Sequence, residues 1–335
     1  MPSILEDWVN RRLRPHYGWA DKRGDMYADA YRSAYVLTYL LSATAVFIAL
    51  LPMAAGLEGP REIVCVAIEF VILFAIVLLL VVGRRRHWHE RWMEYRLLAE
   101  LIRQIRFLVP LGGGRPFPPV PIHHGVYEDL NQTWMYWHMR AIARATGIPS
   151  AKVTPDYVHD CLRYLADVVD GPDGQLNFHR TTETRSNRIG HRLHTASTAL
   201  FVLTIVSIAI HLSLGLSGSA PIPSWIPVGF ISLHHAAIDR WLVLTAATLP
   251  ALGAALSGTA NQGEFARLAK RSAAMGDAFE QFAGQIKSLQ GDGDKQRSAL
   301  KLSQVVPLAS KIGEVMVDEV ADWRVVVIEQ PARPT

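Results

Sequence analysis

IVCVAIEFVILFAIVLLLVV, residues 63–82, is an apolar run of 20 residues with one ionisable side chain, Glu69, and the arginine triplet 84–86 follows it. At a rise of about 1.5 Å per residue, a helix of this length crosses the roughly 30 Å hydrocarbon core of a bilayer. A second apolar run, residues 36–56, precedes it, and only the short turn 57–62 separates the two. The pair therefore predicts a transmembrane hairpin.

Two later apolar runs, residues 195–215 and 241–256, predict a second hairpin. The last run is marginal in length and contains Pro250, so three spans are the alternative to four. We expect four, because a proline inside a membrane helix is tolerated where neighbouring helices and water satisfy the freed carbonyl. The expected fold class is an all-α membrane protein, in which long cytoplasmic helices extend from two transmembrane hairpins.

Arginine and lysine indicate the orientation, since basic loops near the ends of spans remain in the cytoplasm. They are frequent before the first run and between residues 84 and 192, whereas the turn 57–62 holds only Arg61 and residues 212–239 hold none. Both hairpins should therefore insert from the cytoplasm, with both termini cytoplasmic. The expected organisation is an N-terminal cytoplasmic segment (1–34), a first hairpin (35–83), a cytoplasmic helical region (84–194), a second hairpin (195–258) and a cytoplasmic tail (259–335).

Several function classes are not expected. The formal net charge of +4 is explained by arginines that meet anionic lipid headgroups, and no zinc-finger spacing, aromatic RNP pattern or sustained basic patch predicts nucleic-acid binding. No Ser-His-Asp, Cys-His or paired-carboxylate arrangement predicts catalysis, so we expect neither an enzyme nor a cofactor.

The histidine spacing predicts no metal site. His211 falls within the third apolar run, where we expect a satisfied polar group in a helix bundle. His234, His235 and Asp239 precede the fourth run, and we expect solvation at the membrane interface there rather than proton sensing.

The first cytoplasmic helix is predicted from about residue 88 to 109, where apolar residues recur at helical spacing and continue the second span. Arg96, Glu100 and Arg103 are spaced to form a charge ladder along it, and such ladders are usually structural. The alternative is a signalling role that couples the cytoplasmic state to the second span, with Trp88, Trp92, Arg96, Glu100 and Arg103 as candidates. Two more amphipathic helices are expected at residues 126–147 and 155–170.

The tail contains a heptad seam over about three and a half heptads, typical of helix pairing. Its positions are Phe265, Leu268, Ser272, Met275, Phe279, Phe282, Ile286 and Leu289. Spacing leaves open whether the seam pairs within one subunit or between subunits. The candidates for oligomer contacts are Phe265, Leu268, Met275, Phe279, Phe282 and Ile286. A final helix is expected at about 308–323.

The two halves of the chain follow one plan, since each has a short apolar hairpin followed by a long cytoplasmic helix. This plan resembles an internal structural duplication with little residue identity. The alternative is that any four-span protein with cytoplasmic termini has the same pattern.

The segment GRRRHWHERWMEYRLLAELIRQIRFL, residues 83–108, resembles the SLATT superfamily of SMODS- and SLOG-associated membrane effectors, close to its DUF4231-like members. The residues that carry the resemblance, besides Glu69, are Trp88, Arg91, Trp92, Tyr95, Arg96, Ala99, Glu100 and Arg103. Residues 249–275 are similar to the C-terminal portion of that group. The resemblance implies a pore-forming or membrane-perturbing effector of bacterial conflict and defence systems, located in the inner membrane and triggered by nucleotide signals or nucleotide-binding partners. No SLOG-like nucleotide-binding domain is visible here, so a nucleotide-sensing or nucleotide-producing protein partner is implied.

Two functions follow from these patterns. The first is a homo-oligomeric, ion-conducting pore with Glu69 as the pore-lining candidate, because an ionisable residue in a span is costly unless it faces a cavity, a partner helix or water. The alternative for Glu69 is a protonated carboxyl, or one bonded to Ser42 or Thr44 of the facing helix. The alternative function is a non-conducting membrane scaffold whose cytoplasmic helices recruit a soluble partner.

Overall fold

The computed structural model describes residues 4–113, 133–147, 150, 152–217, 228–291 and 300–328. All regular secondary structure within these residues is helical, which confirms the all-α fold. The chain divides into two compact units. We call Tyr31–Arg86 with Thr184–Ala269 the membrane unit, and Met1–Ala30 with His87–Glu183 and Lys270–Thr335 the bundle unit.

The membrane unit is built from four helices, α2 (Arg14–Ala55), α3 (Pro60–Arg85), α7 (Gln175–Ser217) and α8 (Val228–Gln262), of which α2 and α7 begin in the bundle unit. Each contributes a stretch that is long and apolar enough to cross a membrane. Only 6 to 17% of each apolar window is buried within the chain, so most of this apolar surface requires lipid around it. The protein is therefore a multi-pass membrane protein, and Pro250 lies inside the continuous helix α8.

Helices α7 and α8 are joined by a seam of hydroxyl groups. The Ser197 hydroxyl donates to the carbonyl of Gly253 at 2.8 Å and lies 2.8 Å from the Ser257 hydroxyl. Further along, the hydroxyls of Ser207 and Thr245 are also 2.8 Å apart. Helices in lipid associate through small residues and such polar contacts, because apolar packing has no water to exclude there.

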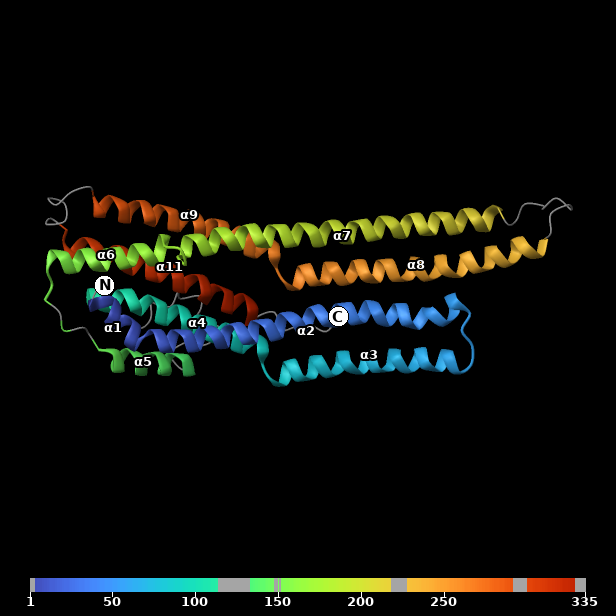
Figure 1. Ribbon diagram of the computed structural model, residues 1–335, viewed down its shortest axis with the longest axis horizontal. Helices are drawn as coiled ribbons and strands as arrows, with labels where there is room; N and C mark the ends of the chain where they lie inside the picture. The colour runs from blue at the N-terminus through green and yellow to red at the C-terminus, as the bar shows by residue number, and fades with distance from the viewer. Residues whose placement is uncertain are drawn as a thin grey trace. The chain divides into compact units, whose positions relative to one another are not determined.

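Helix α8 also packs against α2, so that Figure 1 shows these two helices between α7 and α3. Gly258 makes the close approach possible, since a Cβ there would lie 2.5 Å from the ring of Tyr39. Nearby, the Gln262 amide donates to the Tyr31 hydroxyl.

We expect Gly258→Ala to destabilise the protein by about 1 to 3 kcal/mol, the usual cost of overpacking. The matched control is Gly284→Ala on an exposed face of α9, where a Cβ meets no atom within 4 Å. The control should be neutral or slightly stabilising, because alanine is the better helix former. Thermal unfolding of the detergent-solubilised protein measures both, and equal melting temperatures would contradict the close α8–α2 packing.

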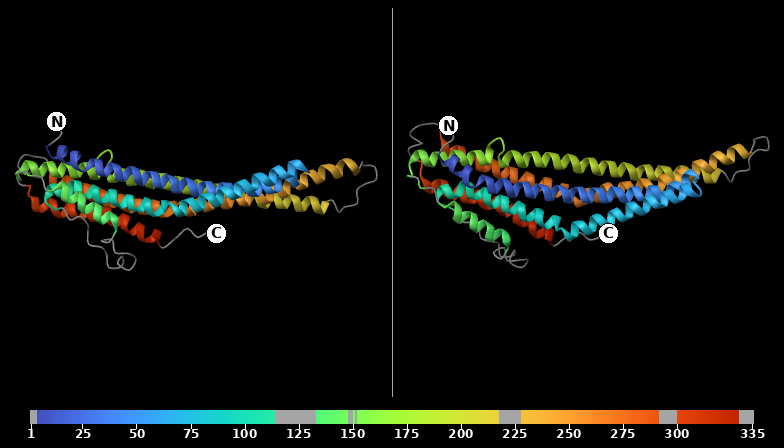
Figure 2. Two further views of the ribbon diagram at one scale, coloured as in Figure 1. Left: turned by 90° about the horizontal axis from the view of Figure 1, so that it is seen from below. Right: turned by 60° about the horizontal axis from the view of Figure 1, so that its bottom comes forward.

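The bundle unit contains helices from all parts of the chain. They are α1 (Ile4–Arg12), α4 (Trp88–Leu108) with the 3₁₀ turn η1 (Val109–Leu111), α5 (Trp134–Thr146), α6 (Pro155–Asp170), most of α9 (Phe265–Gln290) and α11 (Leu302–Ile328). Helices α5 and α6 begin at the side-chain caps Thr133 and Thr154, whose hydroxyls accept the backbone N–H three residues on. Helix α6 coincides with the predicted range, and α4 and α11 lie side by side (Figure 2).

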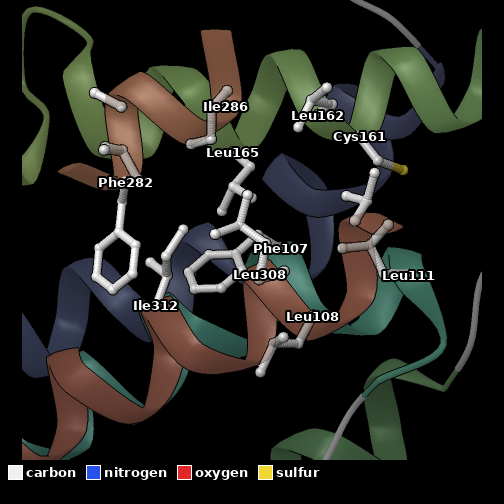
Figure 3. Close-up of a cluster of buried hydrophobic side chains, with 14 of the residues drawn as sticks. Phe107, Leu108, Leu111, Cys161, Leu162, Leu165, Phe282, Ile286, Leu308 and Ile312 are labelled. Carbon is white, nitrogen blue, oxygen red and sulfur yellow. The ribbon is translucent and has the colours of Figure 1, made fainter. Parts of the chain in front are cut away.

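The core of the bundle unit uses the heptad seam of the tail. Phe282 and Ile286 of α9 meet α4, α6 and α11 in one apolar cluster (Figure 3). Phe279 is in the same cluster and is fully buried, whereas Phe265, Leu268 and Met275 are half-buried. The later part of the seam therefore packs within one chain, and an oligomer contact through Phe279, Phe282 or Ile286 would require this core to open.

The two halves of the chain also share their pattern of helix breaks. The 42-residue α2 and the 43-residue α7 run without interruption, while the helix after each hairpin turn ends at a non-glycine residue with positive φ. These residues are His87 (φ 50°), between α3 and α4, and Glu264 (φ 46°), between α8 and α9. Such left-handed residues are uncommon, so their occurrence at corresponding junctions supports the duplication hypothesis.

Candidate functional site

The predicted charge ladder forms a buried cluster in the bundle unit. Glu100 is 3% exposed, and both of its carboxylate oxygens accept hydrogen bonds from Arg103, at 2.9 and 3.0 Å. The guanidinium of Arg96 lies 3.2 Å from the same carboxylate. Two arginines therefore offset the cost of removing this carboxylate from water.

The first turns of α2 complete this cluster. Arg103 donates to the Tyr17 hydroxyl, and its guanidinium lies 5.1 Å from the centre of the Tyr17 ring. Asp21 lies 3.9 Å from Arg96. Burial by itself lowers the pKa of Arg103, but the Glu100 carboxylate and Tyr17 raise that pKa above its usual value. Arg103 thus remains a fixed cation that joins α4 to α2.

The first turns of α7 are held by three consecutive side chains. Phe178 lies beneath the guanidinium of Arg96, at 5.4 Å. Arg180 bonds Asp277 at 2.9 Å and Glu280 at 2.8 Å, both on α9. The middle residue, His179, is 1% exposed and stacks on Phe279 with ring centres 5.5 Å apart.

Glu319, on the last helix α11, joins these contacts at the start of α7. Arg271 of α9 donates to both the side chain and the backbone carbonyl of Glu319, each at 2.7 Å. Nε2 of His179 lies 3.6 Å from the other oxygen of Glu319. Helices α7, α9 and α11 therefore meet at one partly buried carboxylate, which no sequence pattern predicted. The sequence offered no signal for it, since the three residues are far apart in the chain.

The five residues predicted to couple the cytoplasmic state to the second span do not lie together in the structure. Arg96, Glu100 and Arg103 belong to the buried cluster. Trp88 and Trp92 are half-buried in the first turns of α4, and Trp92 lies edge-on to His89 with ring centres 5.7 Å apart.

Glu69 is half-buried in α3, in the most apolar of the four spans. It follows the buried Cys65 by four residues and precedes the half-buried Ile72 and Ile76, so it lies on the inner face of that helix. The hydroxyls of Ser42 and Thr44 donate to carbonyls of their own helix, at 2.9 and 2.8 Å. Within the described residues, Glu69 makes no hydrogen bond or ion pair.

Glu100→Gln should destabilise the bundle unit by about 3 to 5 kcal/mol, because it leaves two largely buried guanidinium groups without their counter-charge. Glu90→Gln is the control on the same helix, where an exposed pair with His87 contributes less than about 1 kcal/mol. Chemical unfolding followed by circular dichroism should separate the two variants. Similar losses from both would contradict a special role for the buried carboxylate.

His179 should make stability depend on pH. It lies in the bundle unit, and burial lowers its pKa from 6.5 to about 4, with Glu100 opposing this effect and Arg271 adding to it. The unfolded chain therefore binds a proton more readily, so stability is lost as pH falls from 6.5 towards 4, by on the order of 2 to 3 kcal/mol. His179→Gln should flatten the fall in melting temperature over this range, whereas the exposed-site control His191→Gln should retain it.

Residues 17–113 match the model of a protein family of unknown function, DUF4231. The matched region runs from the first turns of α2 through α3 and α4 to the residues after η1, so it includes Glu69 and the Glu100 cluster. No curated protein matches the chain. No solved structure matches it either.

Proposed function

We propose that this protein is an ion-conducting, pore-forming membrane effector that assembles from several copies. The observation that carries the proposal is Glu69, a carboxyl group in the most apolar span that has no polar partner among the described residues. Such a group is costly in hydrocarbon, and water in a lumen would remove that cost. A ring of carboxylates from several copies would favour cations.

The surface of α3 supports assembly. Only 6% of its apolar window is buried in the chain, the smallest share of the four spans. The side chains of Ile63 and Phe70 are each 68% exposed, so α3 offers a broad apolar surface to lipid or to another copy. We place Glu69 of each copy at the edge of a lumen that one chain alone does not enclose.

The two charge clusters provide a way for a signal to control the pore. Helices α2 and α7 each begin in the bundle unit and continue into the membrane unit without a break. The Glu100 cluster holds the first turns of α2, and the Glu319 cluster holds those of α7. A signal that alters either cluster would act directly on a helix that crosses the membrane.

The family match and the resemblance of residues 83–108 favour an assignment to the SLATT superfamily. On that assignment, the protein lies in the bacterial inner membrane with both termini in the cytoplasm, and acts in a defence system. A nucleotide-sensing or nucleotide-producing partner would provide the trigger.

A non-conducting scaffold is the second candidate, and a surface of α5 favours it. Trp137 is 62% exposed and Trp134 is 40% exposed, with Arg140 stacked over the Trp137 ring at 5.8 Å. Exposed aromatic and arginine side chains are typical of protein recognition surfaces.

Membrane potential in a bacterial host distinguishes the two functions. Wild type should depolarise the membrane in the presence of a nucleotide-producing partner, and Glu69→Gln at matched expression should depolarise it less, because the cation-attracting charge is removed. Glu58→Gln is the control, since it removes an exposed carboxylate from the turn between α2 and α3.

Purified protein in liposomes provides the second readout. Wild type should pass potassium in preference to chloride, and Glu69→Gln should reduce that preference. A correctly inserted protein that conducts in neither assay, with the partner absent and present, would refute the pore. Loss of partner binding in Trp137→Ala would then favour the scaffold.

A further inference from the structure

Three arginines share one face of α7 just before its apolar stretch begins. Arg185, Arg188 and Arg192 follow one another at spacings of three and four residues, so they lie on one side of the helix along about 10 Å of its axis. We call this side the arginine face. All three side chains are exposed, and none of them makes a hydrogen bond or an ion pair with the described residues. From residue 184 to its end, α7 contains no Asp or Glu.

Other arginines of α7 and α9 differ, because they have carboxylate partners. Arg180, five residues before Arg185, bonds Asp277 and Glu280. Arg267 lies 3.0 Å from Glu264. The arginine face therefore takes no part in joining α7 to α9, and its charge is available to a ligand outside the chain.

The arginine face points away from the helices that pack against α7. Ser186 and Ser197 are buried, and Ser197 bonds α8. A Cβ at Gly190 would lie 3.3 Å from Phe265. At about 100° per residue, these inward positions lie about 100° or more around the helix from the three arginines. Helix α7 is at the edge of the four membrane helices (Figure 1), so its arginine face meets the surrounding lipid.

The same face continues into the membrane as apolar side chains. The residues 18 positions, or five helical turns, after the three arginines are Leu203, Val206 and Ile210. Their side chains are between 45 and 52% exposed. One face of α7 therefore changes from cationic to apolar along its length, as a phospholipid changes from headgroup to acyl chain.

We propose that the arginine face binds the headgroup of an anionic phospholipid, whose acyl chains lie along the exposed apolar side chains that follow. Guanidinium groups form paired hydrogen bonds with phosphate oxygens. Arg192 lies about 5 Å before Thr195, where the apolar run begins, and so falls within a headgroup layer roughly 5 to 7 Å thick. Arg188 and Arg185 are about one and two turns further out, and their long side chains can extend towards the same layer.

Net positive charge alone predicts only a general attraction to anionic lipid, whereas three unpaired guanidinium groups on one face predict a site. A zwitterionic lipid should bind there less well, because its own cation repels the arginines. The arginine triplet that ends α3 differs, since residues 84–86 are consecutive and point about 100° apart around the helix.

The test uses the full-length protein in neutral detergent, titrated by calorimetry with short-chain phosphatidylglycerol, short-chain phosphatidylcholine and glycerol 3-phosphate. Wild type should bind phosphatidylglycerol at least about 10-fold more tightly than the other two compounds. Arg188→Gln should weaken the binding of phosphatidylglycerol about 5-fold, the equivalent of about 1 kcal/mol for each arginine near anionic lipid. Replacing all three arginines with glutamine should weaken it roughly 100-fold.

The control replaces three exposed arginines of the bundle unit, and so removes the same net charge. Its substitutions are Arg11→Gln, Arg144→Gln and Arg163→Gln. The control should bind phosphatidylglycerol as wild type does, and circular dichroism should show both triple variants folded.

The proposal is overturned if wild type does not prefer phosphatidylglycerol, or if both triple variants lose affinity equally, which would leave only a general charge attraction. Equally tight binding of glycerol 3-phosphate would also overturn it, because a free phosphate would then be the ligand. If the arginine-face variant binds phosphatidylglycerol as wild type does, an acidic protein becomes the better candidate for this face. The readout is lipid binding, so the result is independent of whether the protein conducts ions.

Discussion

Apolar side chains gain little by leaving lipid for one another, and this constraint governs how the membrane unit holds together. Its helices approach at Gly253 and Gly258 and are joined by hydroxyl pairs such as Ser197 with Ser257. The bundle unit, in contrast, is stabilised by apolar packing, because its core of phenylalanine, leucine and isoleucine excludes water. One chain therefore uses two kinds of packing, and the long helices α2 and α7 take part in both.

The buried charges lie where these two helices begin. Arg103 donates a hydrogen bond to Tyr17 of α2, and the Glu319 carboxylate lies 3.6 Å from Nε2 of His179 on α7. Removing such groups from water costs several kcal/mol each, and apolar side chains of similar size often stabilise a core as well or better. Stability alone therefore does not explain why charges occupy these positions. Their placement at the first turns of two membrane-crossing helices is consistent with transmission of a signal.

The sequence was sufficient to predict the two transmembrane hairpins, because composition over about 20 residues determines whether a helix is stable in lipid. The fourth run was ambiguous because its length is marginal and it contains Pro250. Thr245 within it and Ser257 just beyond it pair with hydroxyls of α7, which composition alone does not reveal. The heptad seam predicted a buried face, but periodicity does not specify which helix covers it. The contacts of residues 178–180 could not be foreseen, since their partners lie about 80 or more residues away in the chain.

The hydroxyl seam also bears on how the chain enters the membrane. Helix α3 has the highest hydropathy of the four spans and can insert on its own, whereas the α8 stretch has the lowest. The hydroxyl pairs that Thr245 and Ser257 of α8 make with α7 can form only once α7 lies beside it. Biogenesis should therefore proceed in two steps, in which the first hairpin integrates as soon as it leaves the ribosome. The second hairpin should enter as a preassembled pair, so α7 must wait at the translocon until α8 has been synthesised.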